Sequence, residues 1–148
     1  MKYRLYVDII AGLLILLFVY TALSKLDNYS FFQAQLNLYP FIGLFSSTLA
    51  WAIPSMELLI AILLLLPAYR IKGLLAALIL LIVFTVYLLI MILYTPDLPC
   101  SCGGVIQSFT WTQHIFFNCG FITVTFIAVL LRKRNKNTKK NIEKIHTH

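Results

Sequence analysis

The stretch LLAALILLIVFTVYLLIMILY, from Leu74 to Tyr94, contains no charged residue and decides the fold class of this chain. A helix needs about 20 mainly apolar residues to cross the hydrocarbon core of a bilayer, and this stretch is long enough. Three further apolar stretches approach that length, at residues 5–23, 51–69 and 114–131. Because backbone polar groups must be hydrogen-bonded within the membrane, each stretch should form a helix. We therefore predict an all-α integral membrane protein, with a four-helix transmembrane bundle over residues 1–131.

The composition excludes two other classes of protein. Of the 148 residues, 61% are hydrophobic and only 11% are charged, and the mean hydropathy is +0.89. A soluble domain typically has about 45–50% apolar and about 25% charged residues. Small domains bury the smallest fraction of their surface, so the excess apolar surface must face lipid. A soluble enzyme and a disordered chain are both excluded.

The basic residues predict how the bundle is oriented. Seven of the 12 lie in the tail at residues 132–148, and with four spans the same side receives Lys2, Arg4, Arg70 and Lys72. The opposite side receives only Lys25. By the positive-inside rule, both termini and the basic tail should be cytoplasmic. No nucleic-acid-binding motif accompanies the basic tail, so we expect the lipid bilayer and not nucleic acid as its partner.

Two cysteines lie close together in the sequence PCSCGG at residues 99–104, in a loop predicted to be extracytoplasmic. A bond between Cys100 and Cys102 would close a very small ring, and strained disulfides are the more oxidising and labile ones. This pattern favours a redox-active pair. Cys119, near the start of the fourth stretch, is then a candidate resolving thiol. The alternatives are a permanent bond from Cys100 or Cys102 to Cys119, or metal binding with His114; the ligand set falls short of a closed zinc site, so we predict no metal.

Polar residues inside the apolar stretches form a second group of candidates. An intramembrane carboxylate is costly and suggests function, and Glu57 has no basic neighbour one helical turn away. Its expected partner is Lys25, in a pair that either fixes packing or has a role in proton handling or quinone binding. His114 and Asn118 share a helix face and could support the site. Asp8 is expected to pair with Arg4, four residues earlier.

The segment from residue 24 to residue 50 is aromatic and amphipathic, with a run of apolar residues that includes Phe31, Phe32, Leu36 and Leu38. Such a segment suits the membrane interface. We expect it to lie across the outer end of the bundle and to shield the core from water.

Four motifs together resemble the MauE branch of the DoxX-like membrane proteins: ALSKL at residues 22–26, PSMEL at 54–58, PCSCGG at 99–104, and the stretch from Trp111 to Asn118. The resemblance extends over about residues 3–131. It implies a redox-associated four-helix protein of the bacterial inner membrane, linked in this branch to methylamine utilisation and to maturation of a disulfide-rich periplasmic subunit. The family's cysteine motif corresponds to Cys100 and Cys102. Gly103 stands where an aromatic residue commonly follows the second cysteine, so we do not carry methylamine over as the substrate.

These observations lead to one functional prediction and one main alternative. The chain is predicted to be a thiol–disulfide redox protein that relays electrons between an extracytoplasmic thioredoxin-like or disulfide-containing protein and a membrane acceptor. Quinone is the candidate acceptor, and no other cofactor is predicted. The alternative is a non-enzymatic assembly or accessory factor with a structural disulfide. A small transporter is disfavoured, because the chain lacks inverted repeats and broken helices.

Overall fold

The computed structural model describes residues 2–38, 42–94 and 111–146. The elements are α1 (Lys2–Asp27), α2 (Tyr29–Asn37), the 3₁₀ turn η1 (Gly43–Phe45), α3 (Ser46–Leu65), α4 (Arg70–Tyr94) and α5 (Trp111–His146). The segments long and apolar enough to cross a membrane are Arg4–Asp27, Gly43–Leu65, Arg70–Ile90 and Gln113–Arg134. The predicted all-α membrane bundle with four spanning helices is confirmed.

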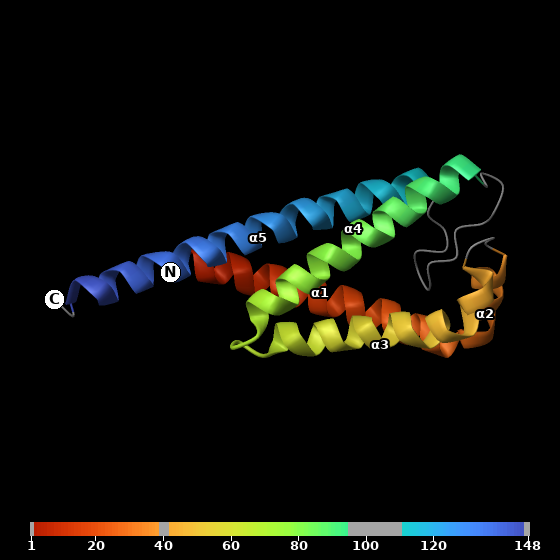
Figure 1. The fold of residues 1–148 in the computed structure, drawn as a ribbon, viewed down its shortest axis with the longest axis horizontal. Helices are drawn as coiled ribbons and strands as arrows, with labels where there is room; N and C mark the ends of the chain where they lie inside the picture. Colours follow the sequence, from red (N-terminus) through yellow and green to blue (C-terminus); the bar gives the residue numbers. More distant parts are fainter. Residues whose placement is uncertain (1, 39–41, 95–110, 147–148) are drawn as a thin grey trace.

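The four long helices form two pairs, α1 with α3 and α4 with α5, which converge at one end and diverge toward the other (Figure 1). Where the pairs converge, each long helix contributes one buried alanine to a shared apolar core: Ala11, Ala61, Ala77 and Ala128. Small residues let helices in a membrane approach closely, so this core holds the two pairs together. At the other end, the fully buried alanines among the described residues are Ala22 on α1 and Ala50 on α3, and those two helices remain close.

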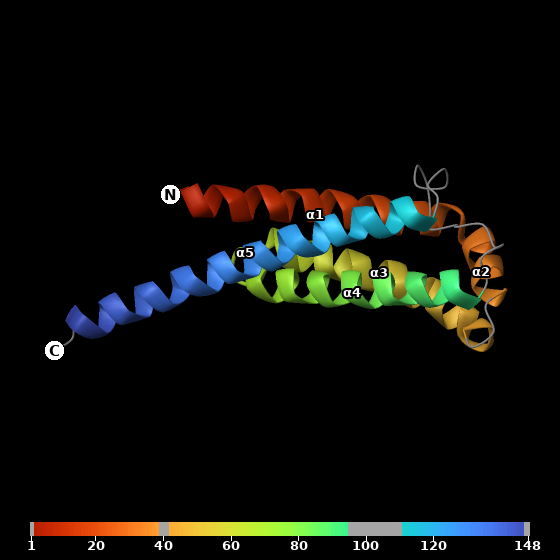
Figure 2. The ribbon, with the colours of Figure 1, turned by 90° about the horizontal axis from the view of Figure 1, so that it is seen from above.

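The short helix α2 crosses the end of the bundle where the two pairs diverge, as Figures 1 and 2 show, and we call this the α2 end. The Tyr29 ring packs against Trp51 of α3, with 5.4 Å between ring centroids. Ser46, at the start of α3, donates a hydrogen bond to Asn37 Oδ1 at 2.6 Å. These contacts fasten α2 to α3, so the aromatic segment covers the end of the bundle.

The turn between α3 and α4 occupies residues 66–69, four residues earlier than the break expected at residues 70–73. Pro67 lacks a backbone N–H and cannot continue the hydrogen-bonding pattern of α3. The Arg70 side chain then donates from Nε to the Leu64 carbonyl at 3.2 Å, which satisfies an oxygen left free at the end of α3. Arg132 of α5 donates to the Pro67 carbonyl at 3.1 Å, so the turn is also tied to α5.

Asp8 does not pair with Arg4 as expected. Its carboxylate binds the Arg70 guanidinium, which comes from the first residue of α4. The helix-period argument found a suitable partner on the same helix, but Arg70 reaches Asp8 from the neighbouring turn and can bind it while also bonding α3. The pair therefore links α1 to the α3–α4 turn at the converging end.

Helix α5 continues beyond its apolar segment to His146, so the basic residues after Arg132 extend the helix past the bundle (Figure 1). Both chain termini lie at the converging end. Eleven of the 12 basic residues belong to this end, and only Lys25 belongs to the α2 end. Which end faces the cytoplasm stays a prediction.

Candidate functional site

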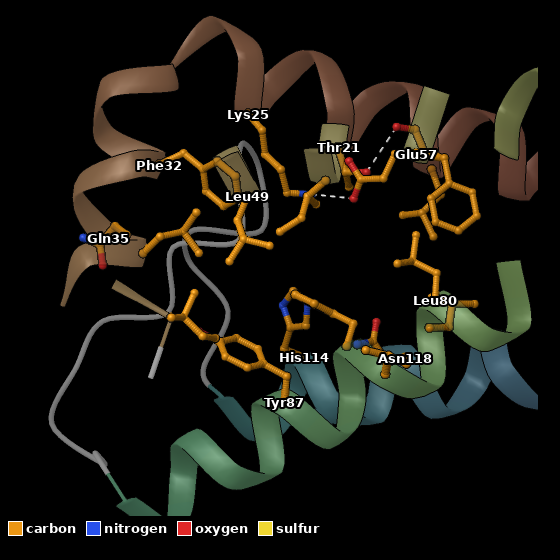
Figure 3. A pocket seen from close by; sticks show the side chains of 18 of the residues that line it. Thr21, Lys25, Phe32, Gln35, Leu49, Glu57, Leu80, Tyr87, His114 and Asn118 are labelled. Carbon is orange, nitrogen blue, oxygen red and sulfur yellow. Dashed lines mark hydrogen bonds and ion pairs between the residues drawn. The ribbon is translucent and has the colours of Figure 1, made fainter. Parts of the chain in front are cut away.

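A cavity of about 310 Å³ lies at the α2 end, between the diverging helix pairs. This volume is at the lower limit of the roughly 300–1,000 Å³ typical of small-molecule sites. All five helices contribute to its wall, which is mainly apolar and aromatic. The polar side chains in the wall are Thr21, Lys25, Gln35, Glu57, Tyr87, His114 and Asn118. All seven are labelled in Figure 3, where they surround the space on several sides.

Lys25 and Glu57 form the ion pair that the sequence predicted. Lys25 Nζ lies 2.5 Å from Glu57 Oε1, and the two residues are only 5% and 7% exposed. Lys25 is in the last turn of α1, where a positive charge is favoured by the helix dipole. Glu57 lies in the middle of α3, so the pair joins these two helices. The Phe32 ring of α2 lies 5.9 Å from the ammonium, which places a cation–π contact at the cover of the cavity.

The second carboxylate oxygen, Glu57 Oε2, is buried and has no hydrogen-bonding partner in the described part of the chain. Thr21 lies near Glu57 in the wall, and its hydroxyl is 3.2 Å from the Phe18 carbonyl oxygen (Figure 3). A carboxylate accepts up to four hydrogen bonds, so Glu57 keeps acceptor capacity.

His114 and Asn118 line the opposite side of the cavity from the ion pair (Figure 3). They are one helical turn apart on α5 and only 3% and 4% exposed, which confirms that they share a buried face. His114 packs edge-on against the Phe84 ring, with 5.7 Å between centroids. His114 Nδ1 and Asn118 Nδ2 have no hydrogen-bonding partner within the residues described.

Three further polar residues of the wall were not found by sequence reasoning: Thr21 on α1, Gln35 on α2 and Tyr87 on α4. Gln35 on α2 is half-buried, and its Oε1 atom is buried without a described partner. Tyr87 lies on α4, three residues after Phe84. The spacing of Phe32, Gln35 and Leu36 on α2 was the one available signal, since residues three and four apart share a helix face. Tyr87 sits in a stretch that is apolar on every face, so no local pattern marked it.

The cysteines are only partly placed. Cys100 and Cys102 lie outside the described residues, so their pairing stays a prediction. Cys119 is a free thiol on an exposed face of α5, not among the residues that line the cavity. Its neighbour Asn118 does line the cavity. The two residues face different ways because consecutive residues of a helix point about 100° apart. Among the residues described, no three His, Cys, Asp or Glu side chains gather in a way that could hold a metal ion.

Of three comparisons with known proteins, one found a match. No curated protein and no solved structure matches the chain. A family model does match, over residues 3–131, and this range includes the cavity wall, the ion pair and all three cysteines. Because the match covers most of the sequence, this chain belongs to the MauE family, described as methylamine utilisation protein MauE.

Proposed function

We propose that this chain is a thiol–disulfide redox protein of the bacterial inner membrane. It relays electrons between an extracytoplasmic thioredoxin-like or disulfide-containing protein and a membrane acceptor. Membership of the MauE family associates it with methylamine utilisation but names no reaction. The redox role is our own inference, and the observation that carries it is the position of the cavity.

The cavity lies near the end of α4 and the start of α5, the two helices that flank the segment with Cys100 and Cys102 in the sequence. Tyr87 is two helical turns from the end of α4, and His114 is one turn from the start of α5. The end of α4 and the start of α5, which flank residues 95–110 in the sequence, therefore both lie at the α2 end. A cavity with buried polar groups at this end would give a reactive cysteine pair a membrane-embedded reaction partner. Because the basic residues gather at the converging end, we propose that the α2 end is extracytoplasmic.

In the proposed exchange, a thiolate of the partner attacks the Cys100–Cys102 disulfide and forms a mixed disulfide. The second thiol of the partner then releases it, so the partner leaves oxidised and both cysteines are reduced. Two electrons and two protons pass from the cysteines to the membrane acceptor, which restores the disulfide. Lys25, Glu57, His114 and Asn118 are proposed to support this step from the cavity wall. Cys119 remains a candidate resolving thiol, which the cysteine mapping below tests.

The test is the redox state of the three cysteines in native membranes. Free thiols are alkylated with a mass tag after equilibration at a series of glutathione potentials, and peptides are mapped. We expect a Cys100–Cys102 bond that opens at a mild potential, well above about −300 mV. A Cys102→Ser variant should fold normally but fail to complement a deletion strain. A bond from either cysteine to Cys119 that resists reduction would contradict the relay and favour a non-enzymatic assembly factor.

A further inference from the structure

Four residues of the cavity wall carry buried polar atoms that have no hydrogen-bonding partner in the described part of the chain. These atoms are Gln35 Oε1, Glu57 Oε2, His114 Nδ1 and Asn118 Nδ2. They come from three different helices and all belong to the cavity wall. Unpaired polar atoms in a buried site are costly, and native proteins pair the great majority of them. A wall with four such atoms indicates a ligand that supplies hydrogen-bonding groups of its own.

The arrangement of these groups limits the shape of the ligand. In Figure 3 the Lys25 ammonium and Glu57 lie on one side of the space, and His114 and Asn118 lie on the other. The ammonium and the Asn118 amide are both donors, so hydrogen-bond donors face the space from opposite sides. Aromatic rings from α2, α4 and α5 also line the wall: Phe32, Phe84 and Phe117. This layout fits a flat ring with an acceptor at each of two opposite positions.

The charge of the wall also limits the ligand. The charged residues of the wall are Lys25 and Glu57, and their charges neutralise each other through the 2.5 Å contact. An anionic or cationic ligand would find no uncompensated charge at this pair, and burying a charge without a counter-charge is costly. The cavity therefore favours an uncharged ligand.

We infer that the cavity binds the headgroup of a quinone, with one ring carbonyl accepting from Lys25 and the opposite carbonyl accepting from Asn118. This inference rests on the proposed function for its redox chemistry, although binding itself needs only the described residues. Reduction adds one proton and one electron to each carbonyl oxygen, which gives the hydroquinone. Cys100 and Cys102 lose the same two protons and two electrons as their S–H bonds break and one S–S bond forms.

The test measures binding by the full chain in lipid nanodiscs. The probe is an azido-substituted benzoquinone that labels the protein when illuminated, and decyl-benzoquinone competes for its site. Asn118→Leu removes one donor from the wall. Thr125→Val is the matched control, because Thr125 is fully buried two turns further along the same face of α5 but does not line the cavity. A double Cys100→Ser, Cys102→Ser variant separates binding from thiol chemistry.

We expect saturable labelling of cavity-wall peptides and roughly three- to tenfold weaker competition in Asn118→Leu, the effect of losing one net hydrogen bond. Thr125→Val should bind like the wild type, and so should the double serine variant. Saturable binding by the double serine variant together with an inert cysteine pair would refute the proposed relay and leave this inference intact. Three outcomes would overturn the inference of a quinone site. They are equal binding by Asn118→Leu and wild type, labelling outside the cavity wall, and competition by dodecanoate in place of the quinone. A helix circular dichroism spectrum for each variant excludes misfolding as the cause.

Discussion

Replacing Lys25 alone should destabilise this protein much more than replacing Lys25 and Glu57 together. The structure buries both partners, at 5% and 7% exposure, with 2.5 Å between the charged atoms. Lys25→Met would leave the Glu57 carboxylate without its cation inside the bundle. Removing one partner of a buried pair typically costs about 3–5 kcal/mol, because a buried charge is left uncompensated. Glu57→Leu should carry a similar cost.

The double variant Lys25→Met, Glu57→Leu removes both charges and keeps apolar volume in the wall. Such replacements are often neutral or stabilising, so the double variant should recover most of the loss. The two single effects should therefore add up to far more than the double effect, with a coupling energy of several kcal/mol. The same chain supplies a control pair, Asp8 with Arg70, whose side chains are 52% and 19% exposed. A partly exposed pair should show a coupling energy of about 0–1 kcal/mol.

The assay is reversible unfolding of each purified variant in mixed micelles with increasing sodium dodecyl sulfate. The loss of helix is monitored by far-ultraviolet circular dichroism. The coupling energy is computed from four proteins for each pair. If the Lys25–Glu57 coupling were no larger than that of Asp8 with Arg70, burial would not be what makes this pair strong. The structural argument would then be wrong, and so would the view that the pair fixes α1 against α3.

Three further perturbations follow from the packing. In Gly43→Ala the new Cβ would lie 2.9 Å from the Asn37 carbonyl oxygen, so the link between α2 and α3 must shift; we expect a loss of about 1–3 kcal/mol in the same unfolding assay. Gly12→Ala meets nothing within 4 Å and should gain about 0.5–1 kcal/mol, and a loss there would refute the glycine argument. Thr125→Val removes a buried hydroxyl that has no partner among the described residues, so stability should rise by about 1 kcal/mol; a fall of that size would reveal a hidden partner.

Much of the fold could be predicted from sequence because membrane insertion depends on local composition. The stretch from Leu74 to Tyr94 has to be a helix whatever surrounds it, since no other structure satisfies its backbone in lipid. The partner of Glu57 could be predicted for a similar reason. Few charges occur inside the apolar stretches, and only Lys25 stands at the same end of the bundle.

The partner of Asp8 could not be predicted in this way. Arg4 and Arg70 both belong to the converging end, and the spacing along one helix favoured Arg4. Arg70 binds instead because the α3–α4 turn brings it to α1 while it also bonds the Leu64 carbonyl. Sequence spacing measures neighbours on a helix, whereas this contact depends on how two helices and a turn are packed.

The sequence by itself determined the class of this protein, its four spanning helices, its buried ion pair and the shared face of His114 and Asn118. These properties depend on hydropathy and on the 3.6-residue period, which are local. Only the tertiary structure decided that α2 closes over the diverging pairs, that Gln35 and Tyr87 join the wall, and that Cys119 faces away from it. A cavity is the space that several helices leave unfilled together, so its existence depends on the angles between them, which no single stretch specifies.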